Sequence, residues 1–367
     1  MSSELLQGRA GHCSSEERPN SARAEGILPE PTRREADLGL LKEAARDAFL
    51  SGAAGLQLVE ERVRSCLDSE AEVLSSISRY LLELGGKRIR PLLAVLLTKL
   101  FGISSYPKSL IDAAAGVELI HMATLLHDDI IDQSPTRRNH PSAFIKFGVS
   151  PTLLAGDFLL VKAFGLCAKL DPYIIQATER ACIELTEGEV LEGTLADGRR
   201  LSLEQYVNII SKKTASLFQL AAGIGAFSAG VTPADLSRVE QFGRAAGLAF
   251  QIVDDILDVV ADADLLGKPS GTDLKQKTPS LPNILWLESG DPRALEFFSI
   301  EQPNRAQCDS ALEVLRSSDI IAQSRAVARQ HADTAQAALH GLEADTLDLT
   351  VRDRLLSLVE YTLERCL

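Results

Sequence analysis

The fold of this chain follows from one stretch, residues 119–132, which reads Leu-Ile-His-Met-Ala-Thr-Leu-Leu-His-Asp-Asp-Ile-Ile-Asp. Its apolar residues show no strand-like alternation, and a helix that is apolar on most faces is buried at the centre of a protein. On such a helix Asp128 and Asp132 lie four residues apart and share a face. Like charges at this spacing repel, and carboxylates oppose the dipole at a helix C-terminus; each effect costs from a few tenths to about 1 kcal/mol. The motif is therefore either solvated at a helix end or retained to bind a ligand.

The same arrangement occurs again further along the chain. Asp254, Asp255 and Asp258 follow the apolar run Gly247–Val253. Two repelling triads at the ends of buried helices are explained if they face each other around a strongly positive group. Mg²⁺ prefers hard oxygen ligands and leaves positions for water and phosphate. We therefore predict that both triads belong to one magnesium site.

Most of the chain has the composition of helices. Ala, Leu and Glu dominate from about Leu40 onward, and short breaks separate the helical segments. We predict an all-α protein, a large single-domain helical bundle over residues 39–367, with central helices ringed by amphipathic ones. Residues 1–38 are rich in Pro, Ser, Gly and charge and are expected to form a disordered N-terminal tail. The segments predicted to be central, because they are apolar on most faces, are 113–126, 153–168, 216–230 and 243–260.

The composition argues against several classes of protein. The net charge of −13 disfavours nucleic-acid binding. The six cysteines have no metal-binding spacing, so free thiols in a reducing compartment are expected. No uncharged apolar run reaches about 18 residues, and no apolar segment follows Met1. We expect no transmembrane segment, no secretory signal and a cytoplasmic location.

A second group of residues is basic. Residues 85–91 read Gly-Gly-Lys-Arg-Ile-Arg-Pro between two predicted helices, and the glycines permit close approach of the backbone to a ligand. Arg137 and Arg138 follow the first triad, and Lys213 and Lys268 lie in loops or at helix ends. Guanidinium and ammonium groups bind phosphate. Carboxylate triads beside these cations indicate one diphosphate bridged by metal and a second one bound directly.

These motifs resemble those of the trans-isoprenyl diphosphate synthase family, whose marks are a GGKRxRP segment and two DDxxD motifs. The likeness covers residues 74–367 and is of the medium- to long-chain type. It implies an isoprenoid-synthase helical bundle and a homodimer. Further segments that fall in family order are Gly156–Leu159, Glu187–Glu189, Lys213-Thr214, Phe250-Gln251, Gly267–Leu274 and Leu281-Pro282.

The resemblance implies a role for each residue at the site. Asp128 and Asp132 would hold two Mg²⁺ ions on the allylic diphosphate, and Asp254 would hold a third from the opposite wall. The aspartates that would support those ions directly or through water are Asp129, Asp255 and Asp258. The residues implied for the allylic substrate are Arg137, Lys213, Thr214, Gln251 and Lys268. Those implied for isopentenyl diphosphate are Lys87, Arg90, His121 and Arg138, although His121 alone would be interpreted as a core histidine.

The reaction implied by the resemblance depends on charge. Metals and cations stabilise negative charge on the leaving diphosphate, so the allylic carbon–oxygen bond ionises. The isopentenyl double bond attacks the carbocation, and the departing diphosphate accepts the proton, so no protein base is needed. The residues assigned to this step are Asp128, Asp132, Asp254 and Lys213.

Product length should depend on the helix surface beneath the first triad. Short-chain members usually place an aromatic residue four or five positions before the motif, where this chain has Thr124 and Ala123. With Ile120 and Gly116, these residues would face the growing chain. We expect a long all-trans product of roughly 35 to 50 carbons, of the kind used as a quinone side chain. A residue on a neighbouring helix could stop the chain earlier.

Several alternatives remain open at this point. A terpene cyclase commonly lacks the second DDxxD motif, and a short-chain (farnesyl or geranylgeranyl) synthase is disfavoured by the small residues before the first. A subunit of a heteromeric synthase typically loses a triad, and a divalent-metal buffer would need neither basic cluster. The chain departs from the family pattern at Asn139, where Gly is frequent, and at Glu192, where Gln is common. Glu192 adds negative charge near the site.

Overall fold

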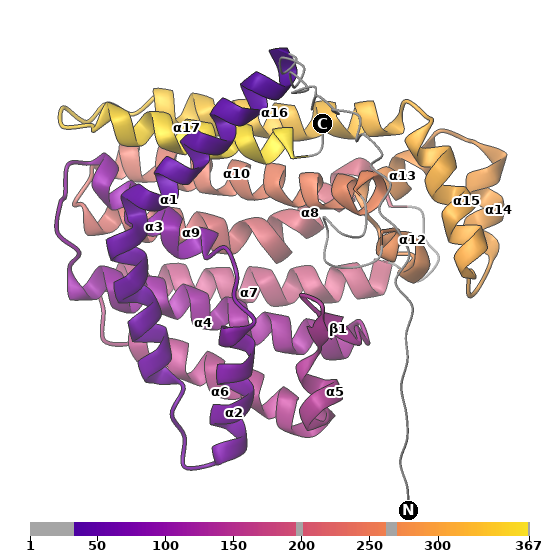
Figure 1. Ribbon diagram of the computed structural model, residues 1–367. Coiled ribbons are helices and arrows are strands. Elements are labelled where there is room, and N and C mark those ends of the chain that lie inside the picture. Colours follow the sequence, from indigo (N-terminus) through magenta and orange to yellow (C-terminus); the bar gives the residue numbers. More distant parts are fainter. Residues whose placement is uncertain (1–32, 196–200, 262–269, 366–367) are drawn as a thin grey trace, which may run out of the picture.

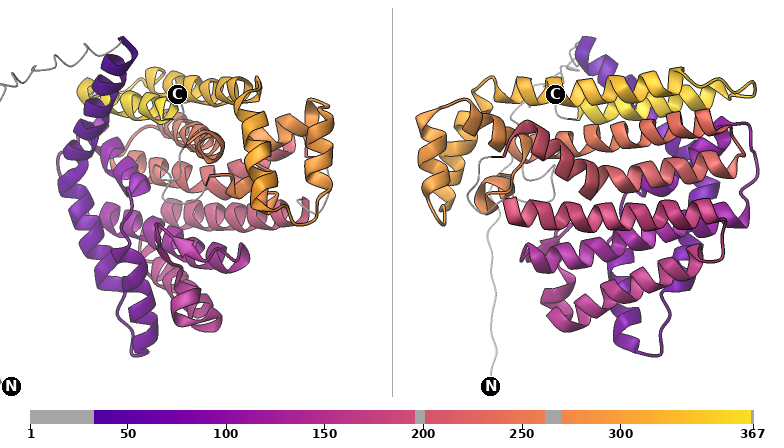
Figure 2. Two further views of the ribbon diagram at one scale, coloured as in Figure 1. Left: turned by 45° about the vertical axis from the view of Figure 1, so that its right-hand side comes forward. Right: turned by 180° about the vertical axis from the view of Figure 1, so that it is seen from behind.

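The computed structural model describes residues 33–195, 201–261 and 270–365. Long helices lie side by side in layers, as views from the front and from behind show (Figures 1 and 2). This confirms the predicted all-α fold. In chain order the helices are α1 (Arg33–Cys66), α2 (Glu72–Glu83), α3 (Ile89–Leu100), α4 (Lys108–Ile131), α5 (Ala143–Phe147), α6 (Val149–Cys167), α7 (Pro172–Leu195), α8 (Leu203–Ile210), the π-helical turn η1 (Ser211–Ala215), α9 (Ser216–Ser228), α10 (Pro233–Val260), α12 (Thr272–Gln276), α13 (Leu281–Glu288), α14 (Pro292–Ser299), α15 (Arg305–Arg316), α16 (Ile320–His340) and α17 (Leu349–Glu364).

Helix α1 begins earlier than the sequence analysis predicted. Residues 33–38, assigned there to a disordered tail, belong to this helix. Arg, Glu, Ala and Leu in that segment are good helix formers. They extend a helix whose later turns are buried against α3, α4 and α17, for example at Ala48 and Val59. Residues 1–32, the rest of the predicted tail, lie outside the described residues.

A short β-hairpin follows α4. Strand β1 (Thr136–Arg137) pairs antiparallel with β2 (His140–Pro141). The turn residues Arg138 and Asn139 have φ angles of 53° and 63°, the positive values that a two-residue hairpin of this type requires. Asn tolerates this conformation better than most residues. Asn139 can therefore stand where the family often has Gly.

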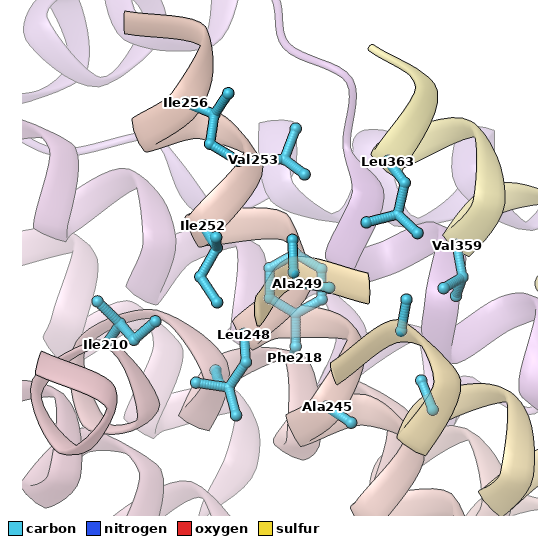
Figure 3. Close-up of a cluster of buried hydrophobic side chains, with 14 of the residues drawn as sticks. Ile210, Phe218, Ala245, Leu248, Ala249, Ile252, Val253, Ile256, Val359 and Leu363 are labelled. Carbon is cyan, nitrogen blue, oxygen red and sulfur yellow. The ribbon is translucent and has the colours of Figure 1, made fainter. Parts of the chain in front are cut away.

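The bundle buries two hydrophobic clusters. Helix α10 is central to the larger one and packs against both α9 and α16. Figure 3 shows its side chains Ala249 and Ile252 near Phe218 of α9 and Val359 of α17. The second cluster joins α2, α4, α6 and α7, and α4 packs closely on α6. The segments predicted to be central are confirmed for α4, α9 and α10.

Helix α6 is the exception among the segments predicted to be central. Leu154, Val161 and Phe164 are exposed, because only one face of this apolar helix packs on the bundle. By length and composition alone, α4 and α6 are each apolar enough to cross a membrane. Burial inside the bundle explains the composition of α4, but it does not explain that of α6. The outer face of α6 is thus a large exposed apolar surface.

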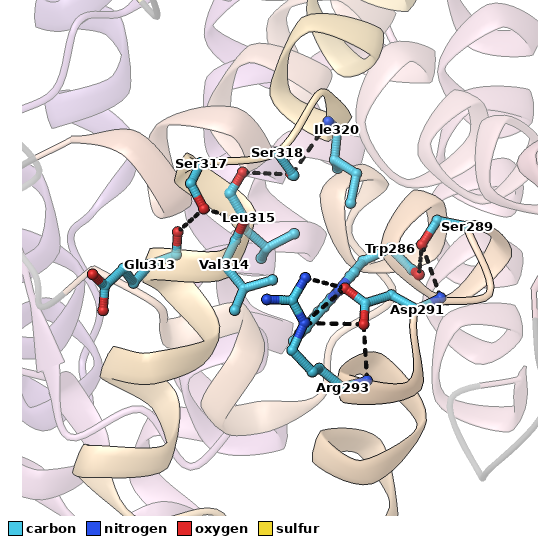
Figure 4. Close-up of polar contacts among 10 residues, drawn as sticks. All are labelled: Trp286, Ser289, Asp291, Arg293, Glu313, Val314, Leu315, Ser317, Ser318 and Ile320. Carbon is cyan, nitrogen blue, oxygen red and sulfur yellow. Dashed lines mark hydrogen bonds and ion pairs between the residues drawn. The ribbon is translucent and has the colours of Figure 1, made fainter.

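The segment from α13 to α15 forms a smaller group of helices at one end of the bundle (Figures 1 and 2). Asp291 caps α14: its carboxylate accepts a hydrogen bond from the backbone N of Arg293 at 2.9 Å and from Trp286 Nε1 at 3.3 Å (Figure 4). The Arg293 guanidinium also pairs with it. These bonds fix the turn between α13 and α14, and α13 in turn contacts α10 near the second aspartate triad.

Candidate active site

A cavity of about 500 Å³ is lined by residues of both hydrophobic clusters and of the polar segments between them. Its walls come from the loop before α3, from α4, α7, η1, α9 and α10, and from the end of α17. Segments far apart in the sequence thus bring the acidic and the basic residues to one site, while Lys268 lies outside the described residues. The predicted residues that line the cavity are Lys87, Arg90, His121, Thr124, Asp128, Arg137, Arg138, Lys213, Thr214, Gln251 and Asp254.

The first triad lies at the C-terminal end of α4. Asp128 lines the cavity, and Asp132, the C-cap residue, is exposed to solvent. Burial raises the pKa of Asp128 to about 7; Glu189 and Asp132 act in the same direction, while Lys213 opposes them. Burial also raises the pKa of Asp132. Both carboxylates are therefore in surroundings that a nearby cation would stabilise.

Asp129 is buried and is held by a hairpin residue. Arg137 Nε donates a hydrogen bond to its Oδ1 at 3.0 Å. Its buried Oδ2 has no hydrogen-bond partner among the described residues. A buried carboxylate oxygen without a donor is costly, so its surroundings fit a cation or an ordered water.

The second triad lies in the last turns of α10. Asp254 lines the cavity, and Nη1 of Arg365 lies 3.4 Å from its Oδ1. Asp255 and Asp258 are buried, and neither is among the described residues that line the cavity. The three aspartates of this motif are therefore not equivalent.

Asp255 is bonded to protein donors on both carboxylate oxygens. Its Oδ2 accepts hydrogen bonds from the Tyr206 hydroxyl at 2.7 Å and the Leu281 N–H at 3.0 Å, and its Oδ1 accepts one from Gln251 Nε2 at 2.9 Å. Burial nevertheless raises the pKa of Asp255 to about 6. Asp258 accepts a hydrogen bond from a backbone N–H of α12 at 2.9 Å. This geometry favours a structural role for both aspartates over direct metal ligation, and a contact with metal through water stays a prediction.

The carboxylates that face the cavity fit a cation that keeps coordination positions for other ligands. Within the described ranges, no three acidic, His or Cys side chains converge as a ready-made metal site. Mg²⁺ usually takes one or two carboxylates and completes its shell with water and substrate phosphates. Asp128 and Asp254 offer oxygen atoms from two helices, and the unpaired Oδ2 of Asp129 is a further acceptor. The donors therefore fit a metal that binds together with diphosphate.

Arg90 and His121 bring basic groups to the buried part of the cavity. Burial lowers the pKa of Arg90 to about 10. Its guanidinium lies 4.8 Å from the Phe218 ring centre, and its buried Nε has no hydrogen-bond partner in the described part of the chain. Such a cation indicates an anionic ligand. Burial and the nearby Arg90 and Arg138 hold the pKa of His121 well below its ordinary value, so its ring is neutral and lines the cavity.

The glycine-rich loop before α3 fits closely around Arg138. Gly86 has a φ of 144°, and a Cβ there would come within 2.8 Å of the Arg138 guanidinium. Arg88 has a φ of 48° and donates a 2.6 Å hydrogen bond to the buried Glu118, 30 residues away. This ion pair fixes the loop that presents Lys87 to the cavity. Sequence reasoning missed the pair, because an isolated Glu in an apolar helix does not identify its distant partner.

Lys213 lies on η1, and π-helical turns are frequent at functional sites. Gly188 of α7 lets this turn approach closely, since a Cβ there would lie 2.6 Å from the backbone N of Lys213. The Lys213 ammonium pairs with Glu189 at 2.8 Å and also with Glu192. Although burial acts to lower it, these two carboxylates raise the pKa of Lys213 above its ordinary value. Lys213 is therefore charged and is held between two glutamates.

The two residues predicted to control chain length differ in position. Thr124 lines the cavity, together with the apolar Leu125, Leu185 and Leu217. Ala123 is fully buried and is not among the described lining residues. Successive helix residues project about 100° apart, which turns Ala123 to another face of α4.

Arg365 is a cavity residue that sequence reasoning did not find. Besides its contact with Asp254, its guanidinium lies 5.8 Å from the Phe250 ring centre. No local motif marks it. The packing of α17 along α3 and α10 brings this end of the chain to the cavity.

Three comparisons with known proteins agree with this site. The octaprenyl diphosphate synthase of Escherichia coli (strain K12) is 34% identical over 303 residues, which cover 82% of this chain and 92% of that protein. The short chain isoprenyl diphosphate synthase of Methanothermobacter thermautotrophicus is 32% identical over 317 residues, 84% of this chain and 96% of that one. The crystal structure of a polyprenyl synthase from Caulobacter crescentus CB15, complexed with calcium and isoprenyl diphosphate, matches with a TM-score of 0.80 and 32% identity, covering 89% of this chain and 98% of that chain.

A family model described as Polyprenyl synthetase matches residues 71–315. This range includes the glycine-rich loop and both aspartate triads. The helical bundle with its facing carboxylates defines a metal-dependent enzyme of isoprenoid synthesis, and the chain belongs to the polyprenyl synthetase family. It is a polyprenyl diphosphate synthase, a trans-prenyltransferase.

Proposed function

We propose that this enzyme condenses isopentenyl diphosphate with an allylic diphosphate in repeated steps, with three Mg²⁺ ions per site, and releases a long-chain all-trans polyprenyl diphosphate. The observation that carries this proposal is the shared cavity. Asp128 and Asp254 face it from α4 and α10, and Arg90 reaches it with an unpaired Nε. Carboxylates for the metal-bound diphosphate and cations for the second diphosphate are thus present together.

The side chains of this cavity suit an ionisation mechanism. When bound, Mg²⁺ would neutralise charge on the departing diphosphate. Lys213 and Thr214 are placed to contact that diphosphate, and Thr214 is oriented by a 2.8 Å hydrogen bond to Gln251. Leu185 and Leu217 form an apolar lining that keeps water from the allylic cation. The second diphosphate would bind at the Arg90 side.

The long product is supported by Thr124, the residue of α4 that reaches the apolar lining. A threonine there leaves space that an aromatic residue would fill. A short-chain product is the alternative, since the curated relatives include a short-chain synthase as well as an octaprenyl one.

The test is incubation of the purified protein with Mg²⁺, farnesyl diphosphate and labelled isopentenyl diphosphate, followed by chain-length analysis. A ladder of products that extends well beyond geranylgeranyl length would support the long-chain proposal. A stop at farnesyl or geranylgeranyl length would leave a short-chain synthase.

Substitution at Thr124 tests the path of the growing chain. Thr124→Phe should shorten the product, because the ring would project into the cavity, whereas Ala123→Phe should chiefly destabilise the packed side of α4. Product analysis of both variants, with thermal unfolding as the control, separates the two effects. Shortening by Ala123→Phe alone would show that the chain passes on the other side of α4.

We further propose that the enzyme is a homodimer whose contact includes the outer face of α6. Val161 is 68% exposed and Leu154 is 57% exposed, and exposed apolar surface of this kind is typical of an interface. Light scattering should give a mass of two chains, and Val161→Glu should reduce it to one. A monomeric wild type that turns over only with a second protein would instead indicate a heteromeric synthase.

A further inference from the structure

The contact between Lys213 and two glutamates of α7 is unusual for a residue expected to bind an anion. The Lys213, Glu189 and Glu192 side chains are 24%, 20% and 21% exposed, so all three lie at the edge of the cavity. An ammonium already paired with two carboxylates carries no surplus positive charge toward an incoming diphosphate.

The same ammonium also acts on the first aspartate triad. Lys213 is the strongest charge that favours the ionised forms of Asp128 and Asp132, while Glu189 acts against both. Glu192 and Asp132 likewise disfavour each other's charge. This wall of the cavity therefore gathers four carboxylates around one lysine, so a free diphosphate is repelled here.

Glu192 is the member of this group that the sequence marks as different, because Gln is common at its position. Gln has the same shape and can accept a hydrogen bond from Lys213, but it has no charge. The chain thus carries one more negative charge beside the cavity than the family pattern requires, without losing the lysine.

We propose that Glu192 is a positioning residue that keeps Lys213 neutralised toward metal-free diphosphate, so that the allylic site accepts its ligand as the magnesium complex. The inference rests on the proposed function of this site. A bare diphosphate meets repulsion from Glu189 and Glu192, whereas a metal-bound diphosphate brings its own positive charge. Glu192 thereby couples substrate entry to metal loading.

The experiment measures binding of inorganic pyrophosphate by isothermal titration calorimetry, in EDTA and in Mg²⁺, for the wild type and Glu192→Gln. In EDTA the variant should bind pyrophosphate at least about tenfold more tightly, because one repelling charge is removed at close range. It should also reach half-maximal turnover at a lower Mg²⁺ concentration. The matched control is Glu187→Gln, which breaks the neighbouring pair with Lys212, whose residues do not line the cavity, and should change neither quantity.

Three results would overturn the inference. These are a wild type that binds pyrophosphate equally well with and without Mg²⁺, a Glu192→Gln variant with unchanged or weaker binding in EDTA, and an equal gain from Glu187→Gln. The wild-type comparison needs no variant, so the inference remains testable if Glu192→Gln fails to fold, and Glu192→Ala then serves as the second variant. Absence of elongation by the wild type would count against the proposed function, whereas the pyrophosphate measurement stands independently of turnover.

Discussion

The two aspartate triads share one sequence pattern but have different surroundings. In the first, Asp128 faces the cavity and accepts no side-chain hydrogen bond among the described residues, and Asp132 is exposed. In the second, only Asp254 faces the cavity, while Asp255 is bonded to three protein donors that join α8, α10 and α13. One triad is thus an open set of ligands, and the other combines one ligand with groups that hold the wall together.

The largest effect is expected from the open triad. Asp128→Asn should reduce turnover by about 10³-fold, because it removes a charge that faces the reacting diphosphate. The thermal midpoint should not fall, since no hydrogen bond within the protein is lost. Steady-state kinetics and circular dichroism on the same preparation test this. Turnover within about tenfold of the wild type would contradict the role of Asp128.

The closed triad should respond in stability. Asp255→Ala removes the acceptor for the Tyr206 hydroxyl, the Leu281 N–H and the Gln251 amide. Buried donors left without a partner cost about 1–3 kcal/mol each, so the free energy of unfolding should fall by about 3 kcal/mol. Urea denaturation measures it, with Asp128→Ala as the matched control. Equal stability of the two variants would remove the distinction between the triads.

The pH dependence of the metal-free protein should show the strain in the first triad. The pKa of Asp128 is raised to about 7 in the folded state, so the folded protein binds more protons than the unfolded chain between about pH 4 and 7. The stabilisation by this proton is complete below about pH 4 and is lost as the pH rises through about 7. Its size should be roughly 2 kcal/mol, because water in the cavity screens the carboxylate.

Urea denaturation in EDTA between pH 5 and 8 tests this dependence. Asp128→Asn should flatten the decline, because the amide does not titrate. Mg²⁺ with pyrophosphate should restore stability at high pH, since both bind the folded state. An Asp128→Asn profile identical to that of the wild type would disprove the assignment.

The smallest effect concerns the open member of the second triad. Arg365 competes with a cation for Asp254, and this partly exposed contact should be worth up to about 1 kcal/mol. Arg365→Gln should therefore lower the Mg²⁺ concentration for half-maximal activity by up to about fivefold. A titration with Mg²⁺ at saturating substrates measures it. A higher Mg²⁺ requirement would show that Arg365 assists metal loading.

Much of the site was predictable because its residues occur in local patterns. The spacing of Asp128 and Asp132, its repetition at Asp254, and the run from Gly85 to Pro91 all depend on neighbours in the sequence. These patterns correctly indicated a helical bundle and residues that share one cavity. The error at α6 has the same origin, because apolar composition does not distinguish a face buried in the bundle from one left exposed.

Partners across the fold could not be predicted. Nothing near Glu118 indicates Arg88, and nothing near Asp255 indicates Tyr206. The position of Ala123 was misleading for a related reason, since its distance from the motif does not tell which face of α4 meets the cavity. Such contacts depend on helix rotation and on which helices pack together.

The sequence by itself determined the helical fold, the two acidic motifs and the basic loop, because helix formation and residue spacing depend on near neighbours. Only the tertiary structure decided which aspartates remain open to a ligand, that Lys213 lies between Glu189 and Glu192, and that Arg365 reaches Asp254. Burial and long-range pairing decide the charge balance of the cavity, and both arise only when distant helices pack against one another.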